Sequence, residues 1–202
     1  CDYSYFPTTG CRRGYICEER SRFGESGVGR GVCIPGQAGE EPEPVNAPCY
    51  EEVAERGMQF VPQPPISDAP DGRPDLRCSM EGPLLLQSPV AGVNYRYVSH
   101  DEARPILMSC RLAIALDRLG ELLTEFDVVE VGHIGTYNCR AISGMDSLSM
   151  HGLGLAIDLK WFRTADGRVF DVEDDWAHGI TRNFATAEGE FLYRIAWQMH
   201  TR

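Results

Sequence analysis

The sequence predicts an α+β fold for most of the chain, preceded by a small disulfide-rich N-terminal module. Three observations predict it. Apolar residues recur near a period of 3.6 in two segments, which is typical of helices that bury one face. Before and after these helices lie segments in which apolar and polar residues alternate or β-branched residues are frequent. These segments predict strands, most of them antiparallel. Cysteines are concentrated in the first quarter of the chain, where large apolar residues are too few to build a core.

The expected elements follow one another from residue 83 onward. Pro105 suits the first turn of a helix, and Asp166-Gly167 is typical of a hairpin turn. The segments are one or two strands within 83–98, a helix over 104–125, strands over 127–134, 153–162 and 169–172, and a helix over 184–200 whose residues Phe184, Ala187, Phe191, Ile195 and Met199 face the core. The proline-rich stretch 59–78 predicts irregular backbone.

Composition divides the chain into three parts. Residues 1–35 hold four cysteines among scattered glycines and prolines, so crosslinks would have to stabilise this module. Residues 36–48 are rich in Pro, Glu and Gly and predict an extended linker. Residues 49–202 form the α+β domain. The N-terminal module could serve adhesion or spacing, or act only as a stabilising cap.

The chain has eight cysteines and no C-x-x-C pair. This density favours disulfides in an exported protein (periplasmic, cell-surface or extracellular) over free thiols in the cytosol. Eight cysteines allow on the order of a hundred pairings, and Cys49 with Cys78 is one candidate. Cys1 either pairs within the module or carries a lipid anchor of the bacterial lipoprotein type. The cysteines expected in disulfides are Cys1, Cys11, Cys17, Cys33, Cys49, Cys78, Cys110 and Cys139.

Charge and hydropathy exclude several classes of partner. Nineteen basic against thirty acidic residues give a net charge of −11, whereas nucleic-acid binding requires Lys and Arg to neutralise phosphates. No apolar run is long enough to span a bilayer, which takes about 18 residues. No secretory signal peptide is visible, so the chain is expected to be a mature or trimmed form.

The stretch from Ser149 to Asp158 reads S-x-H-x-x-G-x-A-x-D. A neutral nitrogen of His151 and an oxygen of Asp158 are both suitable ligands for Zn²⁺, at about 2.0–2.2 Å. Ser149 could hydrogen-bond the imidazole or a carboxylate and thereby orient it. An ordinary hydrogen-bonded His–Asp pair explains the same two residues without a metal.

Side-chain alternation predicts a recess beside this pair. If residues 154–159 form a strand, Gly154, Ala156 and Asp158 share one face because successive side chains point to opposite sides. The opposite face, with Leu155, Ile157 and Leu159, would then belong to the core. We therefore expect a small-residue recess with a carboxylate at its end.

The pattern resembles that of the M15-type zinc peptidases, which include the D-alanyl-D-alanine carboxypeptidases of bacterial peptidoglycan. Residues 80–202 are more similar still to the bacterial extensin-like C-terminal domain, a branch of that superfamily. This similarity rests on the segment 135–140, on the motif itself, and on Phe162 followed by Asp166-Gly167. The resemblance implies the small α+β fold shared by D-Ala-D-Ala peptidases and hedgehog domains.

The resemblance also implies roles for individual residues. His151 and Asp158 would be the first two zinc ligands. Arg140 would contact the substrate carboxylate or a developing oxyanion, for which a guanidinium is suited; a structural salt bridge is the alternative. Cys110 and Cys139 would be bridged to each other.

The family completes its site with a further histidine and an acidic general base near the C-terminus. We expect this third ligand beyond Arg202, in a longer gene product; a decayed site is the alternative. His200 is the late candidate within the chain, and His133 would support the ligands from a neighbouring strand. His100 and His178 are expected either at the surface or as hydrogen-bonding support for the ligands.

Two functions from different classes follow. The first is an exported zinc peptidase-like domain that acts on peptidoglycan or other cell-surface peptides, with the metal activating a water molecule. The second is a non-catalytic extracellular binding or structural protein on a peptidase-like scaffold, since fold alone does not establish activity. A purely structural zinc would need four closed ligands, and cysteines held in disulfides leave too few.

Overall fold

The computed structural model describes residues 15–22, 29–35, 48–176 and 184–201. The chain divides into two compact units, residues 1–44 and 45–202. In the first unit, β1 (Tyr15–Arg22) and β2 (Gly29–Pro35) form an antiparallel hairpin in which Cys17 lies opposite Cys33. Cys1 and Cys11 lie outside the described residues, so the pairing of the module's cysteines stays a prediction.

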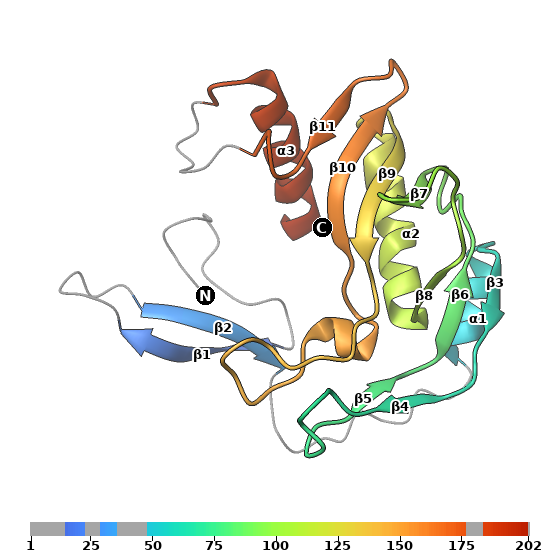
Figure 1. The fold of residues 1–202 in the computed structure, drawn as a ribbon. Helices are drawn as coiled ribbons and strands as arrows, with labels where there is room; N and C mark the ends of the chain where they lie inside the picture. The colour runs from blue at the N-terminus through green and yellow to red at the C-terminus, as the bar shows by residue number, and fades with distance from the viewer. Residues whose placement is uncertain (1–14, 23–28, 36–47, 177–183, 202) are drawn as a thin grey trace. The chain divides into compact units, whose positions relative to one another are not determined.

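The second unit is a mixed α+β structure, as the sequence predicts (Figure 1). Its central sheet has the strand order β11-β10-β9-β7. The pair β7–β9 is parallel and the other pairs are antiparallel. The strands are β7 (Asn94–Tyr97), β9 (Val128–Gly135), β10 (Asp158–Thr164) and β11 (Val169–Asp171). These bounds confirm the strands expected over 127–134 and 169–172.

Two helices and one face of this sheet form the core. The helices are α2 (Cys110–Thr124) and α3 (Ala187–Thr201). Leu116 and Leu123 of α2 and Ile195 of α3 are buried in one cluster with Val131 and Phe162 of the sheet. The opposite face of the sheet carries Gly132, Trp161 and charged side chains such as Arg96 and Arg163.

The remaining elements lie N-terminal to the central sheet or between its strands. They are α1 (Pro48–Glu55), a sheet of β3 (Phe60–Pro62), β6 (Pro83–Leu86) and β8 (Ile106–Ser109), a hairpin of β4 (Ile66–Asp68) and β5 (Cys78–Met80), and the one-turn helix η1 (Met150–Leu153). The segment 83–98 thus contains two strands, as expected. The stretch 59–78, expected to be irregular, holds two short strands that pair with β6 and β5.

The helix predicted over 104–125 begins later, at Cys110. Ile106 and Met108 are buried and pair with β6, so Pro105 precedes a strand and does not lie in a first helical turn. Ser109 caps the helix, because its hydroxyl accepts a hydrogen bond from the Leu112 backbone N–H at 3.2 Å. The pattern of apolar residues runs from β8 into α2 without a break, because both elements bury side chains in the same core.

The strand predicted over 153–162 begins at Asp158, and the expected recess face of Gly154, Ala156 and Asp158 is wrong. Gly154 has φ 64° and ends η1. The backbone N–H groups of Gly154 and Leu155 donate to the carbonyls of His151 and Met150 at 3.1 and 3.0 Å. This double hydrogen bond is the Schellman termination, and it turns Leu155 outward, where it is 39% exposed.

Helix α3 begins at Ala187 and not at residue 184. Ala187 itself is exposed, whereas Leu192 and Ile195 are buried. Phe191 is partly buried and stacks on Phe170 of β11, with ring centroids 3.8 Å apart. The helix therefore packs against the edge of the sheet through Phe191 and its buried neighbours.

Two disulfides join distant parts of the second unit: Cys49–Cys110 and Cys78–Cys139. The expected pairs Cys49–Cys78 and Cys110–Cys139 are therefore both wrong. Cys49 lies in α1, which packs against the start of α2, and the Cα atoms of Cys49 and Cys110 are 5.9 Å apart. Tertiary packing thus brings together cysteines whose spacing along the chain does not reveal how they pair. Within the described parts of the chain, no helix is long and apolar enough to cross a membrane.

Candidate metal centre

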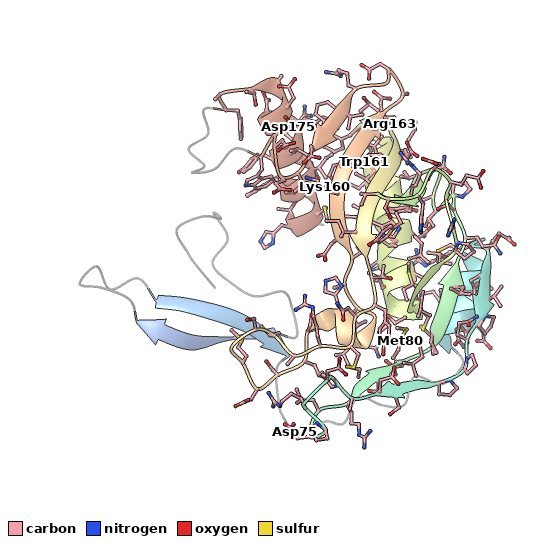
Figure 2. All side chains as sticks on the ribbon, viewed as in Figure 1. Asp75, Met80, Lys160, Trp161, Arg163 and Asp175 are labelled. Carbon is pink, nitrogen blue, oxygen red and sulfur yellow. A yellow bond between two sulfur atoms is a disulfide. The ribbon has the colours of Figure 1, made fainter. Side chains whose placement is uncertain are left out.

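The one-turn helix η1 presents His151 between two well-defined ends. At its start, the Ser149 hydroxyl accepts a hydrogen bond from the His151 backbone N–H at 3.3 Å. At its end, Gly154 adopts the left-handed conformation, and a Cβ atom there would lie 2.6 Å from Cε of Met80, which is labelled in Figure 2. The spacing S-x-H-x-x-G is therefore that of a capped single turn.

The imidazole of His151 is oriented by a backbone carbonyl. Its Nδ1 lies 3.0 Å from the carbonyl oxygen of Thr136. Because a carbonyl oxygen only accepts, Nδ1 carries a proton; Nε2 then presents a lone pair in the neutral ring and donates to Asp158 in the protonated ring. Ser149, expected from the sequence to orient the imidazole or a carboxylate, bonds the backbone N–H of His151, and the Thr136 carbonyl holds the ring.

The free nitrogen of His151 faces Asp158. Nε2 lies 3.3 Å from Oδ1 of Asp158, the first residue of β10. The His151 side chain is only 12% exposed, whereas that of Asp158 is 59% exposed. The pair is thus anchored on the histidine side and open to solvent on the carboxylate side.

A short segment after β9 holds η1 in place. The Asn138 backbone N–H donates to the His151 carbonyl at 3.2 Å, and the Ser149 N–H donates to the Arg140 carbonyl at 3.0 Å. The Thr136 hydroxyl donates to the carbonyl of Leu107 in β8. Sequence reasoning missed Thr136 because its carbonyl, and not a recognisable side chain, performs this role.

Arg140 is exposed and lies within this supporting segment. Its guanidinium forms no hydrogen bond or ion pair with the residues that the structure describes. Its backbone carbonyl accepts a hydrogen bond from the Ser149 N–H. The predicted role of Arg140 toward a substrate stays a prediction.

His133 lies on β9 and points into the core. It is 4% exposed, and its ring meets Tyr97 edge-on at 5.5 Å. Burial, and secondarily the nearby His100, lower the pKa of His133 to about 4, so its ring is neutral at pH 7. Within the described parts of the chain, no hydrogen bond or ion pair joins its ring to His151 or Asp158.

Of the remaining histidines, His200 lies near the end of α3, and His178 lies outside the described residues. Among the residues described, no three His, Cys, Asp or Glu side chains form a group that could hold a metal ion. The donor chemistry of His151 and Asp158 nevertheless fits two zinc ligands, because a proton on Nδ1 leaves Nε2 free to coordinate.

The chain matches a known family over most of its length. Residues 47–196 match the family model described as Extensin-like protein C-terminus. The matched range contains both disulfides of the second unit, η1 and the strand that begins at Asp158. No curated protein and no solved structure matches the chain.

Proposed function

The chain belongs to the extensin-like protein C-terminus family, and from that premise we propose that its second unit is an M15-type, zinc-dependent peptidase domain that acts on cell-wall peptides. The proposal includes the hedgehog and D-Ala-D-Ala peptidase fold and an exported location. The two disulfides support export, because such bonds persist in oxidising compartments.

One observation carries the proposal. His151 is bonded at Nδ1 to the Thr136 carbonyl, and its Nε2 is aimed at Asp158. Metal-binding histidines commonly donate their second nitrogen to a carbonyl or carboxylate, which fixes the ring and its tautomer. A histidine that served only as a surface ion-pair partner would not need this second constraint.

The residues of the site would divide the work as follows. His151 and Asp158 would hold Zn²⁺, with the remaining ligands from outside the described residues; bound zinc lowers the pKa of a coordinated water and polarises a carbonyl. Arg140, whose guanidinium lacks a partner in the described chain, would bind the carboxylate of the peptide. Thr136 and Asn138 keep η1 and its imidazole in position.

A second function is favoured by a different observation. The described residues supply only two ligands, and a His–Asp contact of 3.3 Å is also a satisfactory ion pair without metal. A non-catalytic cell-surface binding protein on the same scaffold would retain this contact for structure alone.

Elemental analysis of the chain purified without chelator separates the two functions. The peptidase proposal expects close to one zinc per chain, lost in His151→Ala and Asp158→Ala together with hydrolysis of peptidoglycan peptides. Asp174→Ala, an exposed carboxylate on the turn after β11, is the matched control and should keep both. Less than a few tenths of a zinc per chain in the wild type, or full hydrolysis without metal, would contradict the proposal.

A further inference from the structure

The carbonyl that orients His151 belongs to the peptide unit between Thr136 and Tyr137. Nδ1 of His151 donates to this carbonyl at 3.0 Å. Because a peptide unit is planar, the direction of its carbonyl is set by the two residues that flank it. The placement of Thr136 and Tyr137 therefore decides where the imidazole is held.

Thr136 fixes one side of this peptide unit from inside the fold. It is only 5% exposed, and its hydroxyl donates to the carbonyl of Leu107 in β8. A buried hydroxyl that loses its acceptor keeps the full cost of desolvation, so this hydrogen bond is expensive to open. The Thr136 side is thus tied firmly to the sheet of β3, β6 and β8.

Tyr137 fixes the other side from a different sheet. Its phenolic hydroxyl donates at 3.0 Å to Oδ2 of Asp68, which lies 69 residues away and ends β4. Burial, and secondarily the hydrogen bond to Asp68, raise the pKa of Tyr137 to about 12, so the phenol keeps its proton and remains a donor at neutral pH. A hydrogen bond that ends on a carboxylate is stronger than one between neutral groups.

The same segment also holds the main chain of His151. The Asn138 backbone N–H donates to the His151 carbonyl at 3.2 Å. Residues 136–138 therefore contact both the ring and the main chain of His151. Their two side-chain anchors, on β8 and on β4, belong to separate sheets (Figure 1).

We propose that Thr136 and Tyr137 are positioning residues for His151. Their side-chain hydrogen bonds hold the shared carbonyl where the Nδ1 proton meets it. The turn η1 fixes only the main chain of His151, because the side-chain torsions keep several staggered positions, so the carbonyl selects the ring orientation. If the peptidase proposal also holds, this anchor aims Nε2 at the metal; only that extension rests on the proposed function.

Exchange of the His151 Nδ1 proton with solvent tests the proposal. It is followed by NMR on the isotope-labelled full chain in EDTA, and the amide of Val131, buried in β9, reports the stability of the fold in the same sample. We expect a protected Nδ1 proton in the wild type. Exchange should be at least about fivefold faster in Thr136→Val and about threefold faster in Tyr137→Phe, relative to the Val131 amide.

Conservative variants should restore the slow exchange. Thr136→Ser keeps the hydroxyl, and Asp68→Asn keeps an oxygen that can accept from Tyr137. Both should exchange within about twofold of the wild type, whereas Asp68→Ala should match Tyr137→Phe. A role of these side chains in the general stability of the fold would change the Nδ1 proton and the Val131 amide together.

Two matched controls carry the same substitutions elsewhere. Thr164→Val removes another buried threonine hydroxyl, at the far end of β10 from Asp158, and Tyr50→Phe removes a phenol bonded to a backbone carbonyl near α1. Both should leave exchange of the Nδ1 proton within about twofold of the wild type.

Three results overturn the proposal: an unprotected Nδ1 proton in the wild type, equal rates in Thr136→Val and Thr164→Val, or equal rates in Tyr137→Phe and Asp68→Asn. Should circular dichroism show that Thr136→Val is unfolded, the variants of Tyr137 and Asp68 decide. Failure of the peptidase proposal is seen separately in the zinc content, because the exchange experiment uses metal-free protein.

Discussion

A Cβ atom on Gly152 would lie 3.0 Å from Sγ of Cys78, so the helical turn that carries His151 rests directly on the disulfide Cys78–Cys139. Cys139 also lies in the segment whose backbone holds η1, between Asn138 and Arg140. The other disulfide, Cys49–Cys110, joins α1 to α2 and closes a loop of the same length, 61 residues. The two bonds should therefore stabilise the fold by similar amounts, about 4 kcal/mol, and differ in their effect on the site.

Replacing both Cys78 and Cys139 by alanine should release η1. Without the disulfide, the Gly154 amide, which donates to the His151 carbonyl, should exchange with solvent at least about tenfold faster. In the proposed zinc site, affinity for the metal should fall by a similar factor, because the turn that carries the imidazole is no longer fixed. Hydrogen exchange followed by NMR measures the first effect and needs no metal.

The matched control is Cys49→Ala with Cys110→Ala. It should lose a similar free energy of unfolding while the Gly154 amide stays protected under native conditions. Equal exchange rates at Gly154 in the two double variants would show that the Cys78–Cys139 bond has no positioning role.

Gly154→Ala should be more destabilising than Gly144→Ala. Both glycines have positive φ, 64° and 75°, so alanine is strained at either position by about 1–2 kcal/mol. A Cβ at 154 additionally meets Met80 at 2.6 Å, whereas one at 144 meets nothing within 4 Å. Urea denaturation should therefore show an extra loss of at least about 1 kcal/mol for Gly154→Ala. Equal losses would mean that Met80 moves aside without cost.

His133 should make the protein less stable in mild acid. Its pKa is about 4 in the folded protein against 6.5 for an unburied histidine, so between these values the unfolded chain binds more protons. The free energy of unfolding should thus decrease as the pH falls through this window, by about 2–3 kcal/mol at pH 4.5 relative to pH 7.

The variant His133→Leu should abolish this part of the pH dependence, because it removes the titrating group while filling a similar volume. Urea denaturation of the two proteins at pH 7 and 4.5 makes the comparison, and a His133→Leu profile parallel to that of the wild type would refute the assignment.

Ser109→Ala should destabilise the protein by about 1–2 kcal/mol. Ser109 is fully buried, and its hydroxyl caps the first turn of α2 through Leu112 N–H. Thr186 performs the same role for α3, accepting from Gly189 N–H at 3.0 Å, but it is exposed and water can replace it. Thermal unfolding should show less than about 1 kcal/mol for Thr186→Ala; the reverse order would indicate that burial does not add to the cap.

Local patterns predicted those elements whose partners are close in sequence. The β-branched run before His133 is a strand, and Asp166-Gly167 forms the hairpin turn into β11. The same reasoning failed at residues 106–109 and 154–157. At residues 106–109, a strand and the following helix bury side chains in the same core, so the pattern of apolar residues does not mark the boundary between them. At residues 154–157, a glycine in the left-handed conformation interrupts what the pattern presents as a strand.

The two chemical groups of the candidate site, those of His151 and Asp158, are recognisable in the sequence from side-chain type and spacing. How these groups are held depends on the fold. Thr136 orients the imidazole through a backbone carbonyl, which every residue possesses and no sequence pattern reveals. Cys78 supports the same turn from a hairpin about seventy residues away, and disulfide pairing depends on which Cα atoms packing brings within reach, 5.6 Å in this case.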